Sequence, residues 1–176
     1  SVGYSDRKYT TGKMAFYLDP VTRDTGCRRV IPGSHKFDDR FASALNEAAP
    51  NSKSNRIEET WGIHGRDLPA IVLETEPGDL LMFNHNTKHA SFGGGTRRRM
   101  FTINLEQRYR DEDLPELRES IGGAARFWID RVYGEAMMKT AGPARMVHLE
   151  QRLANAGDLA ELSRKAREEM NEPTRG

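Results

Sequence analysis

The chain has a single cysteine, Cys27, among 176 residues, which excludes an internal disulfide and a metal site built from several cysteines. No apolar stretch approaches the roughly 20 residues that a helix needs to cross a bilayer, and no signal peptide is recognisable. The formal net charge is only +1, so the charge balance indicates neither a nucleic-acid partner nor a membrane partner. We therefore expect a cytoplasmic protein.

Several common active-site motifs are also absent. The sequence has no phosphate-binding loop, no GxGxxG fingerprint, no GxSxG elbow, no CxxC pair and no internal repeat. Hydrophobic residues make up 36% of the chain, which is enough for the core of one compact domain with an appendage. Any catalytic site in this chain must therefore be built from a sequence pattern other than these common motifs.

The composition changes once along the chain. Residues 1 to 105 are rich in turns and short apolar runs, whereas residues 112 to 171 are charged and have helical periodicity. In the first part, Gly and Pro turns separate short predicted strands at residues 14–18, 28–31, 70–74, 80–83 and 100–105. This pattern is typical of an antiparallel barrel or jelly roll. A long insertion, residues 36–69, interrupts it and contains one predicted helix, 41–48.

The second part is expected to be a helical extension, residues 112–176, packed on a core formed by residues 1–111. Caps and periodicity predict a helix from Asp113 to Gly122, a second with its apolar face at residues 125–136 that stops before Gly142, a third containing Val147 and Leu153, and a last one after Asp158. Burial of a large apolar side chain gains about 1.5–3 kcal/mol. We therefore expect these side chains to be covered by the core or by a second copy of the chain: Trp128, Ile129, Val132, Leu159 and Leu162.

Residues 78–105 hold the strongest chemical signal. His89 follows an apolar strand, and Arg98 lies nine residues later, after a glycine-rich turn that can return both to one end of a barrel. Arginine binds a carboxylate through two parallel hydrogen bonds. Alternation along a strand lets only alternate members of the arginine triplet 97–99 face inward, and a solvated basic turn is the competing interpretation.

Three further side chains bear on a metal site. Asp6, if paired in space with His89, would give two of the ligands of a 2-His-1-carboxylate iron site; by itself it is an ordinary exposed acid. His85 lies four residues before His89, but the segment is not a predicted helix, so this spacing does not aim both at one ion. His64 lies in the insertion and could reach a cavity.

Two blocks of the sequence, residues 17–36 and 77–105, resemble the phytanoyl-CoA dioxygenase family of Fe(II)- and 2-oxoglutarate-dependent oxygenases. The first block, YLDPVTRDTGCRRVIPGSHK, is similar to the family stretch D-x-T-x-x-N/D-G-C-L-x-V-I-P-G-S-H. The second is PGDLLMFNHNTKHASFGGGTRRRMFTINL. The resemblance implies a double-stranded β-helix, or jelly roll, in which a His-x-Asp pair and a distal histidine hold the iron.

By position, the resemblance implies that Asp6 and His89 are the metal ligands. It also implies that Arg98 binds the co-substrate 2-oxoglutarate, with Ser91 beside it; Arg99 is the alternative to Arg98. One departure stands out, because Tyr4 occupies the place of the first histidine.

The sequence therefore predicts an oxygenase-type protein that hydroxylates a small organic molecule, with no nucleic-acid or membrane partner. The alternative is a catalytically silent or truncated relative that keeps an organic-acid-binding barrel. A cupin-like metal protein with other chemistry is a third reading. Association of copies through the C-terminal helices is left open.

Overall fold

A computed structural model describes residues 8–36, 38–48, 62–94 and 98–173. The chain divides into two compact units, residues 1–107 and residues 108–176. No helix in the described ranges has both the length and the apolar character to span a membrane.

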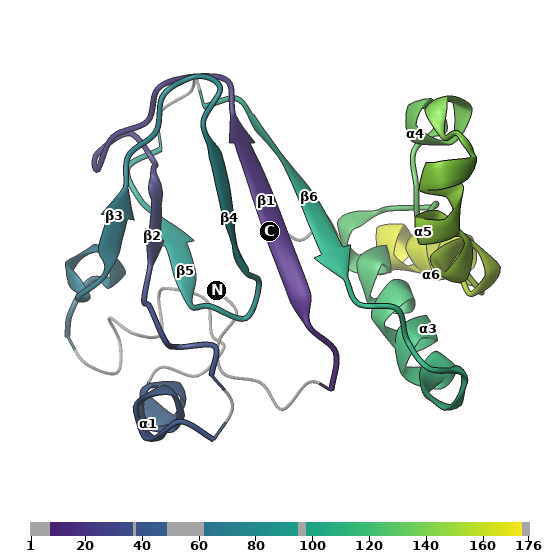
Figure 1. Cartoon of the computed structure of the whole chain (residues 1–176), viewed down its shortest axis with the longest axis horizontal. Coiled ribbons are helices and arrows are strands. Elements are labelled where there is room, and N and C mark those ends of the chain that lie inside the picture. Colours follow the sequence, from purple (N-terminus) through teal and green to yellow (C-terminus); the bar gives the residue numbers. More distant parts are fainter. Residues whose placement is uncertain (1–7, 37, 49–61, 95–97, 174–176) are drawn as a thin grey trace. The chain divides into compact units, whose positions relative to one another are not determined.

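The first unit contains two antiparallel sheets of three strands each (Figure 1). The larger sheet has β1 (Thr11–Tyr17) in the centre, between β4 (Leu80–Asn84) and β6 (Met100–Glu106). The smaller sheet has β2 (Arg28–Val30) in the centre, between β3 (Ile71–Leu73) and β5 (His89–Ser91). The expectation of short antiparallel strands in this half of the chain is therefore confirmed.

The core of this unit lies on one face of the larger sheet. Side chains alternate along β1, so Lys13, Ala15 and Tyr17 share a face. Their register partners on β4 and β6 are Phe83, Leu81 and Met100. Ala15 and Tyr17 are fully buried in a cluster with Val21 and Cys27, against which Val72, Leu81 and Met100 pack.

The opposite face of the larger sheet is apolar and exposed in this chain. Phe16 on β1 and Phe101 on β6 stack with their ring centroids 4.6 Å apart. The other large apolar side chains exposed on this face are Leu80, Met82, Ile103 and Leu105.

The insertion contributes two short elements. Helix α1 (Arg40–Ala48) begins after Asp39, whose Oδ1 accepts a hydrogen bond from the backbone N–H of Ala42. The 3₁₀ turn η1 (Gly65–Asp67) is capped by His64, whose Nδ1 accepts from the N–H of Arg66.

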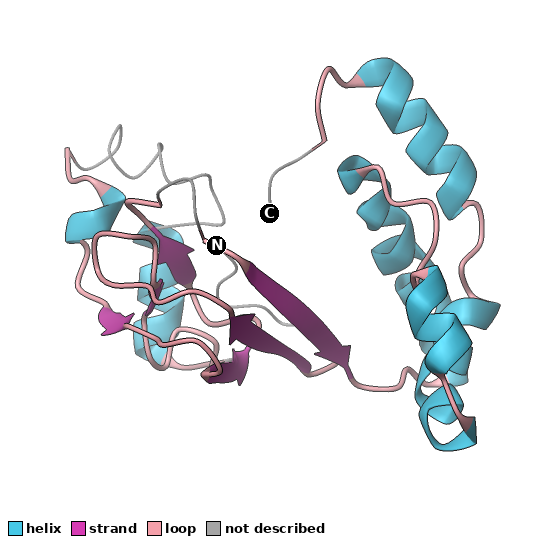
Figure 2. Ribbon diagram, turned by 90° about the horizontal axis from the view of Figure 1, so that it is seen from above, coloured by secondary structure: helices cyan, strands magenta, loops and turns pink. Residues whose placement is uncertain are grey.

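The second unit is entirely helical in its described part (Figure 2). Two 3₁₀ turns, η2 (Asp111–Asp113) and η3 (Gly123–Phe127), flank α3 (Leu114–Gly122). Three α-helices follow: α4 (Glu135–Thr140), α5 (Pro143–Ala154) and α6 (Leu159–Glu169). The buried apolar side chains of this unit are Tyr109, Leu117, Ile121, Ala125, Leu149 and Leu159.

The single helix predicted from Ala125 to just before Gly142 is wrong. The chain leaves η3 at Trp128, which has a left-handed backbone with φ of 59°, and α4 begins only at Glu135. Arg167 stabilises the break, because its guanidinium donates to the Trp128 carbonyl at 2.8 Å and to Asp130 at 2.7 Å. Contacts from an arginine far along the chain thus outweigh the local helical spacing of the apolar residues.

Only some of the large apolar side chains that we expected to be buried in this unit are buried within the single chain. Leu159 is buried, whereas Ile129 and Leu162 are 42% and 41% exposed. Trp128 and Val132 are half-buried. Packing of this unit on the sheets, or on a second copy of the chain, stays a prediction.

Candidate functional site

His89 is the first residue of β5 and is oriented by its own loop. Its Nδ1 lies 2.7 Å from the carbonyl oxygen of Thr87, and because a carbonyl can only accept, Nδ1 carries the proton. The other ring nitrogen, Nε2, therefore keeps its lone pair. Metal-binding histidines are commonly held in one tautomer by such a bond to a backbone carbonyl, so His89 has the form required of a ligand.

Burial also keeps the His89 imidazole neutral. Removal from water lowers its pKa to about 3, and the positive charges of Arg28 and Lys13 act in the same direction, while the Thr87 carbonyl opposes them. A histidine with such a pKa does not need to lose a proton before it binds a metal ion near neutral pH.

Two aromatic rings surround His89. Phe83 on β4 meets it edge-on, with ring centroids 5.2 Å apart, which shows that the inner faces of the two sheets approach each other here. The ring of His85 lies 5.8 Å from that of His89, tilted by 34°. His85 is thus a neighbour of His89 despite the absence of a helix between them.

The arginine triplet divides as strand alternation predicts. Arg98 is half-buried, and its Nη1 donates a 2.6 Å hydrogen bond to the carbonyl oxygen of Gly26, just before β2. The Arg99 guanidinium instead forms an ion pair of 2.7 Å with Asp19, and its side chain is 74% exposed. Arg98 is therefore the more buried member of this described pair, and its guanidinium lies at the turn before β2.

Ser91 lies on the same face of β5 as His89. Its register partner on β2 is Arg28, just as Val30 is the partner of His89. The Ser91 hydroxyl is buried and has no hydrogen-bond partner in the described part of the chain. It is available to a bound molecule.

Sequence reasoning missed Arg28 and Lys13 as residues of this site. Both lie on inward-facing positions of their strands, Arg28 opposite Ser91 and Lys13 opposite Phe83. Only the pairing of strands far apart in the sequence makes this visible. Alternation along 28–30 was the available signal, but it could not say which of two consecutive arginines faces inward.

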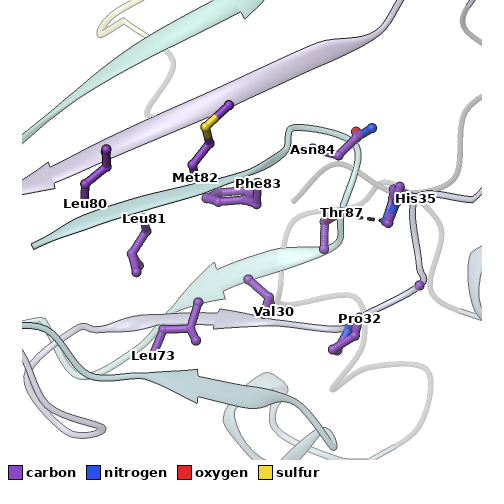
Figure 3. Close-up of a pocket in the computed structure, with 11 residues that line it drawn as sticks. Val30, Pro32, His35, Leu73, Leu80, Leu81, Met82, Phe83, Asn84 and Thr87 are labelled. Atoms are coloured by element: carbon purple, nitrogen blue, oxygen red, sulfur yellow. Dashed lines mark hydrogen bonds between the residues drawn. The ribbon is translucent and has the colours of Figure 1, made fainter.

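A cavity of about 530 Å³ opens between β4 and the smaller sheet (Figure 3). His89 is not among its lining residues, but Phe83 and Thr87, which contact His89, are. Leu81 points toward the smaller sheet, where Val30 and Leu73 face it. At one end, the Thr87 hydroxyl lies 3.3 Å from Nδ1 of His35. The volume suits a small organic molecule.

The remaining predicted residues are not brought to His89 by the described structure. Asp6 and Tyr4 lie outside the described residues. His64 contacts Phe92 with ring centroids 5.5 Å apart; Phe92 alternates with Ser91 and lies against Arg29, on the outer side of the smaller sheet. In the described ranges, no three His, Cys, Asp or Glu side chains are grouped so as to hold a metal ion.

Comparison with known proteins identifies relatives for the sheet-forming half of the chain. The family model for phytanoyl-CoA dioxygenase (PhyH) matches residues 4–101. The chain is 31% identical over 102 residues to the dioxygenase lolE1 of Epichloe uncinata, which covers 58% of this chain and 34% of that protein. It is 30% identical over 99 residues to a probable phytanoyl-CoA dioxygenase of Caenorhabditis elegans, covering 55% of this chain and 30% of that one. The chain thus spans about a third of the length of these curated relatives.

Proposed function

Because the chain belongs to the phytanoyl-CoA dioxygenase family, we propose that it carries the reaction centre of an Fe(II)- and 2-oxoglutarate-dependent dioxygenase acting on a small organic molecule. The observation that supports the proposal is the state of His89, a buried neutral imidazole on the inner face of β5 whose Nδ1 is held by the Thr87 carbonyl. Arg98, a half-buried guanidinium bonded to the carbonyl oxygen of Gly26 just before β2, adds a cation.

The strand pairing supports a double-stranded β-helix as the framework. The β2–β3 pair is nested within the β1–β4 pair, and β5 and β6 then return to opposite sheets. Nested antiparallel pairs that alternate between two facing sheets are the pattern of a jelly roll. We propose that the two sheets belong to such a fold.

The residues of this chain fit an iron ion in part. His89 would hold it through Nε2, and Asp6 would add a carboxylate, which leaves open positions for co-substrate and O₂. When bound, iron and 2-oxoglutarate together supply the activation of O₂ for hydroxylation of a C–H bond, coupled to decarboxylation of the co-substrate. Tyr4 stands where the family has its other histidine, and a neutral phenol is a weaker ligand than imidazole.

The side chains of this site have separate tasks in the proposed reaction. Arg98 keeps donors free after its bond to Gly26, and these would fix a carboxylate of 2-oxoglutarate. The Ser91 hydroxyl would donate to the same group. Phe83 and Leu81 line the cavity with apolar surface, which would hold the substrate and exclude water from the space next to His89.

A catalytically silent relative is the second candidate, favoured by Tyr4. Such a protein would keep the sheets and the carboxylate-binding Arg98 but would bind iron weakly. It would act by binding an organic acid.

The deciding measurement is succinate formation from 2-oxoglutarate with Fe(II) and O₂, together with anaerobic Fe(II) binding. We expect His89→Ala to abolish iron binding, and a matched control, His148→Ala on the exposed side of α5, to leave it unchanged. Equal iron binding by the His89→Ala variant would refute the assignment of the ligand. Weak iron binding without any succinate formation would favour the silent relative.

Association of copies through the second unit remains a proposal. Large apolar side chains are exposed on its described helices at Met137, Val147 and Leu162, and at Ile129 between η3 and α4. Light scattering of the chain and of a Leu162→Gln variant would test it.

A further inference from the structure

We propose that Arg28 is a second carboxylate-binding arginine of this site, on the inner face of the smaller sheet beside Ser91. The proposal rests on the proposed function, because it adds a ligand-binding residue to the same site. It concerns binding alone and needs no chemical step.

The register of the smaller sheet places Arg28 on the inner face. Directly paired residues of neighbouring strands share a face, so Arg28 stands with Ser91, and Val30 with His89. The next residue, Arg29, points to the outer side, where it donates to the carbonyl oxygens of Arg66 and Arg23. The two consecutive arginines therefore have different environments. Arg29 is bonded to backbone carbonyls on the outer side of the sheet, whereas Arg28 lies on the inner side.

Two buried donors on this inner face lack partners. Arg28 Nε and Ser91 Oγ are both buried without a hydrogen-bond partner among the described residues. A buried polar group without a partner is costly, so native proteins seldom retain one without a reason. These two donors come from residues that are directly paired in the sheet, and a guanidinium next to a hydroxyl matches the donor pattern that binds a carboxylate.

The charges of the surrounding side chains agree with this assignment. The Arg28 charge lowers the pKa of Lys13 on the larger sheet, after burial, and also that of His89 on the smaller one. The Arg28 charge therefore acts on side chains of both sheets, as expected for a guanidinium that lies between them. The groups tied to it in the described structure, Lys13, His89 and Ser91, are basic or neutral. An anionic ligand would offset this excess of positive charge.

Arg28 is a feature of this chain rather than of the family stretch that its sequence resembles. After Gly-Cys, that stretch has leucine, whereas this chain has Arg28. Arg98 and Ser91 match the family's co-substrate positions, but Arg28 adds a cation to them. The carboxylate that it binds comes either from 2-oxoglutarate or from an acidic substrate.

Titration of two probes separates these sources. The protein is first titrated calorimetrically with 2-oxoglutarate under anaerobic conditions in the presence of Fe(II). The protein saturated with 2-oxoglutarate is then titrated with benzoate, a simple apolar carboxylate. The variants are Arg28→Leu, which restores the family residue, and Arg28→Lys, which keeps the charge. Arg99→Leu is the matched control, since that side chain is exposed and paired with Asp19. Circular dichroism checks that each variant is folded, and Arg28→Gln replaces Arg28→Leu if that variant is not.

We expect Arg28→Leu to weaken one of the two probes by roughly tenfold or more, with partial recovery in Arg28→Lys and no change in Arg99→Leu. A loss for 2-oxoglutarate identifies the co-substrate as the source, and a loss for benzoate alone identifies an acidic substrate. The proposal is overturned if folded Arg28→Leu binds both probes within twofold of the unaltered chain, or if the unaltered chain binds neither.

These experiments distinguish a failure of the role proposed for Arg28 from a failure of the proposed oxygenase reaction. If Arg28 is needed for binding but no succinate forms, the binding role stands and the oxygenase reaction fails. If succinate forms and depends on Arg98 while Arg28→Leu changes neither probe, the reaction stands and the role of Arg28 fails.

Discussion

The carbonyl oxygen of Gly26 accepts a 2.6 Å hydrogen bond from Nη1 of Arg98, so the turn before β2 holds this half-buried guanidinium in place. Gly26 has a φ of 100°, and a Cβ added there would lie 3.1 Å from the Cα of Gly94 and 3.2 Å from Arg98 Nη1. Both the backbone angle and the close approach require a glycine.

Substitution of this glycine should disturb the arginine as well as the turn. We expect Gly26→Ala to lower the free energy of unfolding by about 1–2 kcal/mol, because alanine is strained in the left-handed region, and to weaken 2-oxoglutarate binding by displacing Arg98. Denaturant unfolding and calorimetric titration measure the two effects. Gly134→Ala is the control, since its φ is −72° and an added Cβ would meet no atom within 4 Å. Intact 2-oxoglutarate affinity in Gly26→Ala would show that the Gly26 contact does not position Arg98.

Arg98 itself can be tested by a change that keeps its charge. Arg98→Lys loses the planar pair of donors, so affinity for 2-oxoglutarate and for succinate should fall roughly tenfold, as for the loss of one charged hydrogen bond worth about 1.5–3 kcal/mol. Arg99→Lys should leave both affinities unchanged, because Arg99 is bound to Asp19 at the surface. If calorimetry finds the larger loss in Arg99→Lys, the co-substrate role belongs to Arg99.

The low pKa of His89 predicts how stability depends on pH in the metal-free protein. The folded pKa is about 3, whereas the unfolded value is about 6.5. Between these values the unfolded chain binds more protons, so the free energy of unfolding rises with pH and is lost on acidification from pH 6.5 toward 3. The His89 contribution to this slope is up to about 1.4 kcal/mol per pH unit.

Denaturant unfolding at several pH values compares the unaltered chain with His89→Gln. The variant should have a shallower dependence below pH 6.5, because it lacks the titrating imidazole. Parallel pH curves for the two proteins would mean that His89 is not desolvated in solution.

The sequence predicted those parts of the fold that depend on local pattern. The strands at residues 80–83 and 100–105 have apolar runs between turn residues, and both are present as β4 and β6. Strand β5 has only three residues, two of them His89 and Ser91, so it has no apolar run and was not predicted. Its existence depends on pairing with β2, which is distant in sequence.

The same distinction applies to the site. Strand alternation could predict that Arg98 and Arg99 separate, and they do. The role of Arg28 could not be predicted, because it follows from the register between β2 and β5. The helix expected through Trp128 failed for a similar reason, since Arg167, far along the chain, binds the carbonyl that a continuous helix would have used.

Tyr4 provides the last prediction, although it and Asp6 lie outside the described residues. If Tyr4 stands in place of the first metal histidine, Tyr4→His rebuilds a His-x-Asp pair with Asp6. Imidazole binds iron without first losing a proton, whereas a phenol with a pKa near 10 must lose one. We therefore expect Tyr4→His to raise Fe(II) affinity roughly tenfold or more, about 1.4 kcal/mol per factor of ten. Anaerobic Fe(II) titration with 2-oxoglutarate present measures it.

A double variant tests whether the gain belongs to this site. Tyr4→His combined with His89→Ala should lose most of the added affinity, because the new imidazole would act together with the one whose Nε2 is free in this structure. A gain that survives removal of His89 would place the new histidine at another metal site. Equal iron affinity of the unaltered chain and the Tyr4→His variant would show that position 4 is not the missing ligand. In that case His85, whose ring lies 5.8 Å from that of His89, is the next side chain to substitute.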